Sequence, residues 1–322
     1  MPGADLLGVL GGMGPLAGGT FVTRLVALTL AGCDQEHIPL VLCNDPRVPD
    51  RSSARLGQGE DPLAAMMVGI RRLEGAGARL IAIPCNTAHL WYDQLAQQAR
   101  VPLLHIVEAV CDDLARLGIR GARIGLMGTP ATLALGLYQG PLTRRGHSVI
   151  EPDAQERQLC IEAIAAVKCN RPEMAFAPAA ACIARLAARG ADAIVLGCTE
   201  LPLAVPHAQR AALGVVLTDS IDALARAAIG QFHRVPREAG NDPTEEEAMA
   251  MLEMMADVLW LYDIQSSLKP QDVPALCRWV MENIKPDHIV IDSLMKCGLA
   301  PTDRHFNRVR PSIDPWKSPQ PT

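Results

Sequence analysis

Short apolar runs alternate with helical stretches from residue 6 to about residue 232, and this alternation restricts the chain to a small set of folds. Several runs, among them 80–83 and 193–196, are continuously apolar rather than alternating between apolar and polar residues. Such runs are typical of strands that helices bury on both faces of a parallel sheet. The pattern therefore predicts an α/β fold with parallel sheets. We expect strands at 6–10, 39–43, 79–83, 102–105, 123–127, 147–150, 192–196 and 214–217.

The same stretch contains an internal repeat. Six residues recur 113 positions later, in the order of a helix end, a glycine cap, a strand and a cysteine. A second repeat pairs residues 8–11 with residues 125–128. The repeat predicts two pseudo-symmetric lobes, which we assign to 1–106 with 210–233 and to 107–209. The six matched pairs are Arg72 and Arg185, Leu73 and Leu186, Gly77 and Gly190, Ala78 and Ala191, Ile81 and Ile194, and Cys85 and Cys198.

The chain changes character after the second lobe. Residues 234–243 are polar with Pro and Gly, which indicates a linker, and three of the four tryptophans follow it. Within 244–322, residues 288–298 resemble the acidic-strand region of a RecA-like domain in phage primase-helicases. We therefore interpret 244–322 as a small C-terminal α/β extension, a truncated RecA-like fragment with a disordered tail; the alternative is a capping extension of the lobes. The chain has no G-x-x-x-x-G-K-[ST] phosphate loop, so we expect no ATP hydrolysis.

Composition excludes several classes of function. The formal net charge is −5, which argues against a nucleic-acid partner or a membrane surface. No apolar run reaches the roughly 18 residues of a spanning helix, and no basic region precedes the first apolar stretch as in a signal peptide. The ten cysteines include no C-x-x-C pair, which argues against disulfides and metal. We expect a reduced, cytoplasmic protein.

Two cysteines stand apart from the others. Cys85, within 83–89, and Cys198, within 196–200, each come at the carboxyl end of an expected parallel strand where a helix begins. Open α/β sheets bind ligands at this end, and a helix N-terminus lowers the pKa of a thiol. We interpret the remaining cysteines of the lobes as small apolar core residues: Cys33, Cys43, Cys111, Cys160, Cys169 and Cys182.

Two equivalent thiols on facing lobes suit one kind of reaction. Inverting a carbon centre needs a base on one face and an acid on the other, and pseudo-symmetry delivers two like groups to opposite faces. A thiolate would remove the α-proton while the opposite thiol supplies one, and the two would exchange roles in the reverse reaction.

The chain from residue 6 to about 232 resembles the cofactor-independent aspartate/glutamate racemase family, on residues 11–15, 49–51, 84–89 and 197–200. The resemblance implies two flavodoxin-like lobes, no pyridoxal phosphate, no metal, and Cys85 and Cys198 as catalytic acid and base. It also implies that Arg51 contacts the side-chain carboxylate of the substrate and that Lys168 is a second cationic position. Paired Arg and Lys suit an acidic amino acid as the small-molecule partner. We further expect a homodimer.

Other substrate contacts rest on weaker signals. Asn86, Thr87 and Thr199 can donate hydrogen bonds to a carboxylate, and the backbone around Met13 can approach one. Asn44 and Thr129, which each follow a strand, and Glu200, which follows Thr199, are further candidates for substrate contacts. His89, one turn after Cys85, is either a catalyst or a residue of the helix face. Glutamate racemases usually carry an Asp-Ser pair in the first loop and a His after the second Cys-Thr; Gly12-Met13 and Glu200 stand here instead, which favours aspartate or broad acidic specificity.

Two other classes of function stay open at this level. Decarboxylases, maleate isomerases and hydantoin racemases use similar lobes, although decarboxylation needs only one proton donor. A binding or regulatory protein derived from the same fold is the second alternative, and two intact cysteines argue against it.

Overall fold

The computed structural model describes residues 6–232 and residue 234. The chain divides into two units, Met1–Asn241 and Asp242–Thr322, and the described residues all belong to the first. The extension expected at 244–322, and all but one residue of the linker expected at 234–243, lie outside the described residues. Among those described, no helix is both long enough and apolar enough to span a membrane.

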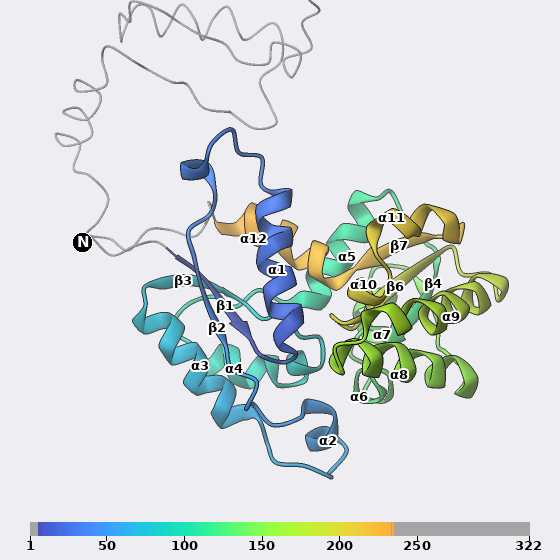
Figure 1. Ribbon diagram of the computed structural model, residues 1–322, viewed down its shortest axis with the longest axis horizontal. Helices are drawn as coiled ribbons and strands as arrows, with labels where there is room; N and C mark the ends of the chain where they lie inside the picture. Colours follow the sequence, from blue (N-terminus) through green and yellow to red (C-terminus); the bar gives the residue numbers. More distant parts are fainter. Residues whose placement is uncertain (1–5, 233, 235–322) are drawn as a thin grey trace, which may run out of the picture. The chain divides into compact units, whose positions relative to one another are not determined.

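The first sheet has three parallel strands in the order β2-β1-β3 (Figure 1). Glycine-rich β1 is central, and each strand passes into a helix or loop at its carboxyl end. The elements are β1 Leu6–Gly11, α1 Pro15–Leu28, η1 Asp34–Glu36, β2 Leu40–Asn44, α2 Arg51–Arg55, α3 Leu63–Gly75, β3 Ala78–Ala82, the 3-10 helix η2 Thr87–Trp91, α4 Tyr92–Gln98 and α5 Ile106–Arg116.

The second sheet has four parallel strands in the order β5-β4-β6-β7. The α/β fold with parallel sheets is therefore confirmed. Its elements are β4 Arg123–Gly128, α6 Pro130–Ala134, α7 Gln139–Arg144, β5 Ser148–Ile150, α8 Ala154–Lys168, η3 Pro172–Met174, α9 Phe176–Ala188, β6 Ala193–Gly197, α10 Leu201–Ala204, α11 His207–Arg210, η4 Ala211–Leu213, β7 Val216–Asp219 and α12 Ser220–Phe232.

The sequence repeat encodes the same packing in both sheets. Gly8 of β1 lies so close to its neighbours that an added Cβ would stand 2.9–3.2 Å from Ala78, Ile81 and Leu73. An added Cβ on Gly125 of β4 would stand 3.0–3.3 Å from three residues, which are the repeat partners of those three: Ile194, Ala191 and Leu186. Each glycine lets a helix end and a neighbouring strand close over the central strand. The repeated residues therefore share one structural role in two related lobes.

Two expectations about the ends of the lobes differ from the structure. We expected 210–233 to belong to the first lobe, but β7 hydrogen-bonds to β6 and so extends the second sheet. Only α12 returns toward the first sheet: it packs on α1, and also on α5, which joins the two lobes. The strand expected at 102–105 is a single parallel bridge between Ile81 and Leu103. Pro102 has no N–H for a ladder, and His105 already caps α5 by accepting hydrogen bonds from its first amides.

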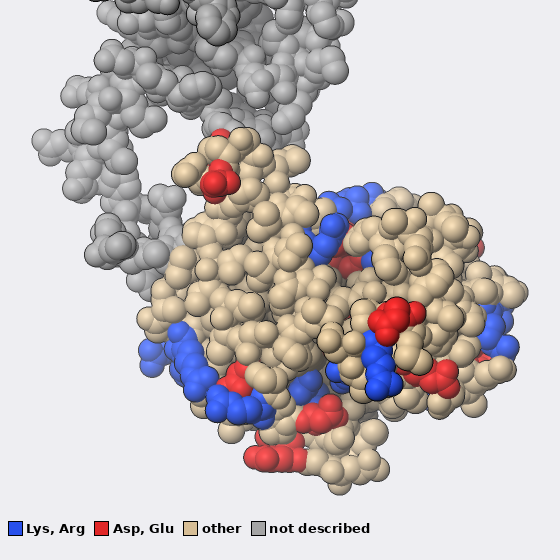
Figure 2. All heavy atoms as spheres, in the orientation of Figure 1, with Lys and Arg blue, Asp and Glu red and all other residues tan. Residues whose placement is uncertain are grey.

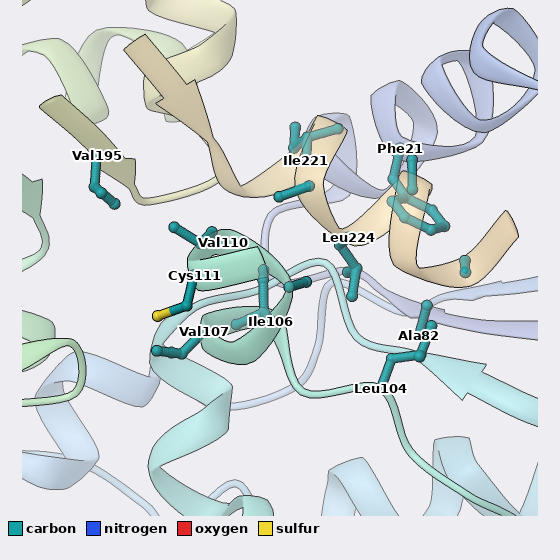
Figure 3. Packing of buried hydrophobic residues seen from close by; sticks show 14 of the residues in the cluster. Phe21, Ala82, Leu104, Ile106, Val107, Val110, Cys111, Val195, Ile221 and Leu224 are labelled. Carbon is teal, nitrogen blue, oxygen red and sulfur yellow. The ribbon is translucent and has the colours of Figure 1, made fainter. Parts of the chain in front are cut away.

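One apolar core joins the two sheets through α5 and α12 (Figure 3). Val107 and Val110 of α5 belong to this core together with Ile221 and Leu224 of α12, and Cys111 is fully buried with them. Cys160 and Cys182 are also buried, as expected, but Cys33 and Cys169 are exposed. The interpretation of those two as core residues is wrong, because both lie at helix ends. On the face drawn in Figure 2, basic side chains lie beside acidic ones rather than forming one basic surface.

Candidate active site

The loops that follow the strands of both sheets enclose one pocket. Ten of the eleven expected site residues line it, although they come from segments far apart in the sequence. Asp50 and Ser52, which flank Arg51, complete the lining. The expected residues in the lining are Met13, Arg51, Cys85, Asn86, Thr87, Thr129, Lys168, Cys198, Thr199 and Glu200.

Asn44 is the exception and does not line the pocket. Its side-chain amide donates a 3.2 Å hydrogen bond to the carbonyl of Pro15, and its Oδ1 lies against Gly11 and Gly18. In the structure this side chain fastens the start of α1 to the end of β2, and a contact with the substrate stays a prediction.

Cys85 and Cys198 reach the pocket from different lobes. Cys85 follows β3 and precedes η2, and Cys198 follows β6 and precedes the four-residue α10. Their exposed fractions are only 4% and 3%, so both thiols are buried within the pocket wall. The repeat thus brings two chemically identical groups into one small site.

His89 supports the backbone of Cys85 rather than facing the pocket. The amide of Ile106 donates to Nε2 at 3.1 Å, so Nδ1 carries the hydrogen and donates to the carbonyl of Cys85 at 2.8 Å. Burial lowers the pKa of His89 to about 4. The ring is therefore neutral at physiological pH, and of the two interpretations of His89 the geometry supports the structural one.

Cys198 has an acidic neighbour. Its Sγ donates to Oε2 of Glu200 at 2.9 Å, and Oε1 of Glu200 accepts from the amide of Gly14 in the first lobe at 3.3 Å. Burial raises the pKa of the Cys198 thiol well above its usual value of 9.0, the charge of Glu200 and its hydrogen bond add to this, and Lys168 opposes it. The expectation that a helix N-terminus lowers this pKa is wrong, because burial and a carboxylate outweigh a helix of one turn.

The site is chemically asymmetric despite the repeat. The shift of 113 positions that relates Cys85 to Cys198 relates Thr87 to Glu200. Where Glu200 presents a carboxylate to Cys198, Thr87 presents a hydroxyl that lies 3.1 Å from Thr129 Oγ1 and 3.3 Å from Thr132 Oγ1. Two like thiols therefore sit in unlike electrostatic surroundings.

Arg51 is a buried cation without a carboxylate partner among the described residues. It is 7% exposed, and its Nη1 donates to the carbonyls of Val48 at 3.1 Å and Pro49 at 2.8 Å, while Nε has no partner. A buried charge is costly unless an opposite charge accompanies it. Lys168 adds a second cation at the pocket, 40% exposed and 4.0 Å from the Asp50 carboxylate. The pocket is thus suited to an anionic ligand.

Sequence reasoning missed four residues that shape this site. Asp50 and Ser52 line the pocket and could have been found, because they flank Arg51 in the same motif. Tyr138 and Ser220 hydrogen-bond to Asn86 from 52 and 134 positions away, and no local signal marks them.

Known proteins resemble this chain over the described region. The family profile described as Asp/Glu/Hydantoin racemase matches residues 10–228. The broad specificity amino-acid racemase RacX of Bacillus subtilis (strain 168) is 28% identical over 233 residues, which are 70% of this chain and 98% of that protein. A glutamate racemase of Roseiflexus sp. (strain RS-1) is 32% identical over 198 residues, 59% of this chain and 66% of that one. The structure of Picrophilus torridus aspartate racemase has a TM-score of 0.64 at 31% identity, covering 71% of this chain and 95% of that chain.

Proposed function

Because the chain belongs to the Asp/Glu/hydantoin racemase family, we propose that this racemase inverts an acidic amino acid, aspartate in preference to glutamate. The reaction would need no cofactor and would use Cys85 and Cys198 as its two proton-transferring groups. The observation that carries the proposal is the presence of both thiols, one from each lobe, in the wall of one pocket.

Each half of the reaction follows from this pairing. A thiolate on one side removes the α-proton of the bound amino acid, and the thiol on the other side delivers a proton to the opposite face. The reverse reaction exchanges the two roles. Backbone amides near Met13 and the hydroxyls of Thr87, Thr129 and Thr199 are the candidate donors to the substrate's α-carboxylate, and Asn86 has one amide hydrogen left for it.

Glu200 can accept the proton of Cys198 and return it. The raised pKa of Cys198 keeps this thiol protonated in the empty pocket, so it begins as the acid. When Cys198 must act as the base, its proton can pass to Oε2 of Glu200, 2.9 Å away, leaving a thiolate and a carboxylic acid with no change in net charge. We therefore assign Glu200 to the thiol rather than to the substrate contact first expected.

The preference for an acidic substrate rests on Arg51 and Lys168. Arg51 is buried and forms no ion pair with a carboxylate in the described part of the chain, although Asp50 lines the same pocket. A substrate's side-chain carboxylate would supply that partner. Similarity to an aspartate racemase supports aspartate. Similarity to a broad specificity amino-acid racemase supports a second candidate, a racemase that also accepts other amino acids.

A substrate panel tests the proposal. Purified protein is incubated with each enantiomer of aspartate, glutamate and alanine, and with maleate and a hydantoin, and products are separated by chiral chromatography. We expect aspartate to racemise fastest, from either enantiomer. Comparable turnover of alanine would favour the broad-specificity candidate. Loss of carbon dioxide, or turnover of maleate or hydantoin without racemisation of aspartate or glutamate, would contradict the proposal. We also propose that the protein is a cytoplasmic homodimer. Analytical ultracentrifugation would test the oligomeric state.

A further inference from the structure

A chain of buried hydrogen bonds links the segment of Cys85 to the segment of Cys198. The hydroxyl of Tyr138 donates to Oδ1 of Asn86, the residue after Cys85. Nδ2 of Asn86 donates to Oγ of Ser220 at 2.8 Å, and that hydroxyl donates to the carbonyl of Leu196 at 3.2 Å. Leu196 belongs to β6 and lies two residues before Cys198. The first of these three bonds joins Tyr138 of the second lobe to Asn86 of the first lobe, and the other two return to the second lobe next to Cys198.

Tyr138 also touches the Cys198 side through its ring. A Cβ added to Gly197, the residue before Cys198, would lie 3.0 Å from Cε2 of Tyr138 and 2.8 Å from the carbonyl of Met127. The Tyr138 ring therefore lies against the backbone of Gly197, next to Cys198. Its hydroxyl donates to the side chain of Asn86, next to Cys85. Only a residue without a side chain fits at position 197.

The bridge is shielded from water and stays neutral. Tyr138 and Ser220 are fully buried and Asn86 is 2% exposed. Burial raises the pKa of the Tyr138 hydroxyl well above its usual value of 10.0, so the phenol remains a donor. In a site closed to water, losing one bond leaves a polar atom without any partner, and the segments that carried it must shift.

We propose that Tyr138 and Ser220 are positioning residues that fix the separation of the Cys85 and Cys198 thiols through Asn86. The inference rests on the proposed two-thiol reaction, because that reaction needs both sulfur atoms aligned with one α-carbon at the same time. Displacement of a reacting group by about 1 Å can cost on the order of a hundredfold in rate. Neither residue lines the pocket, so neither touches the substrate.

Tyr138→Phe tests the proposal because it removes the bridging hydroxyl and keeps the ring. In deuterium oxide, a well-aligned pair places deuterium mainly in the inverted product. If the second thiol is displaced, the intermediate lasts longer and the proton on the first thiol exchanges with deuterium oxide. That thiol then returns a deuteron to the original face, so deuterium appears in the recovered substrate. We expect racemisation of aspartate to fall roughly tenfold to a hundredfold, with KM nearly unchanged, and the ratio of exchange to inversion to rise.

Two further variants keep the test decisive. Ser220→Ala breaks the same bridge at its other end and should raise the same ratio. Tyr92→Phe is the matched control, since the Tyr92 hydroxyl donates at 2.8 Å to the carbonyl of Leu103 within the first lobe, and it should leave the ratio unchanged. In Tyr138→Phe and Ser220→Ala, exchange and inversion could instead both fall by the same factor, and that factor could match the loss of folded protein. The two residues would then be only structural, and the proposal would be overturned.

A readout without substrate separates this proposal from the proposed function. Hydrogen–deuterium exchange should rise at residues 83–90 and 196–201 together in Tyr138→Phe but not in Tyr92→Phe. Should the wild-type protein racemise nothing, the proposed function fails while this coupling of the two segments can still be observed. Unchanged protection of both segments in Tyr138→Phe would overturn the bridge whatever the activity.

Discussion

Replacing Arg51 by alanine would remove the buried cation that the pocket leaves unpaired. The guanidinium uses Nη1 for the carbonyls of Val48 and Pro49, while its Nε is buried without a partner. No carboxylate of the described residues forms an ion pair with it. If a substrate carboxylate fills that place, its contribution disappears with the side chain, because no other arginine is among the described residues that line this pocket.

The size of the effect follows from the kind of contact that is lost. A hydrogen bond to a charged group contributes about 1.5–3 kcal/mol, which corresponds to a loss of roughly tenfold to over a hundredfold in kcat/KM for aspartate. Alanine has no side-chain carboxylate, so its kcat/KM should change little. Arg51→Lys keeps the charge but loses the planar fork, and its effect should be intermediate.

The assay is racemisation of aspartate and alanine by each variant at matched concentrations of folded protein. Arg47→Ala is the control, because Arg47 lies in the loop just before α2, its side chain is 81% exposed, and it pairs with Asp45. It should leave both substrates unaffected. If the ratio of kcat/KM for aspartate to kcat/KM for alanine is the same in Arg51→Ala as in the wild type, the proposed role of Arg51 is refuted.

Three further changes have defined outcomes. Glu200→Gln should lower the pKa of Cys198 toward its ordinary value and move the alkaline limb of the kcat/KM profile to lower pH; a change in KM with an unmoved profile would assign Glu200 to the substrate instead. Burial lowers the pKa of His89 to about 4 from 6.5. The unfolded chain therefore binds the proton first, and stability should be lost as the pH falls from about 6.5 to about 4. In His89→Gln, Tm should depend less on pH in this range, and an unaltered slope would contradict this. Truncation after residue 237 should leave a folded and active racemase, because the family match ends at residue 228; a folded but inactive product would place part of the site in the removed segment.

The parts of the fold that local pattern determines could be predicted from the sequence. Seven of the expected apolar runs became strands within one or two residues of their limits. The central strands β1, β4 and β6 are almost wholly buried, which explains their continuously apolar sequences. The repeat identified the two lobes, since Gly8 and Gly125 need the same neighbours in each. The position of a cysteine directly after a strand was enough to bring both thiols to one pocket.

Other features depend on contacts between distant residues, and local pattern does not contain them. The apolar run at 214–217 predicts a strand but not the sheet to which it belongs. Its place in the second sheet depends on pairing with β6. The pKa of Cys198 is raised because Glu200 turns back toward it, whereas the motif alone suggested a lowered one. Asn86 was expected to serve the substrate, but most of its amide is committed to Tyr138 and Ser220.

The most direct test of the two-thiol reaction follows each enantiomer of aspartate in deuterium oxide with wild type, Cys85→Ser and Cys198→Ser. A serine hydroxyl is far too weak an acid to replace a thiol, so each variant should lose racemisation and retain α-proton exchange for at most one enantiomer, a different one in each. Cys160→Ala is the control, since this buried cysteine lies 3.6 Å from Cys182 and outside the pocket lining. Near wild-type racemisation by either serine variant, or exchange of the same enantiomer by both, would contradict the account.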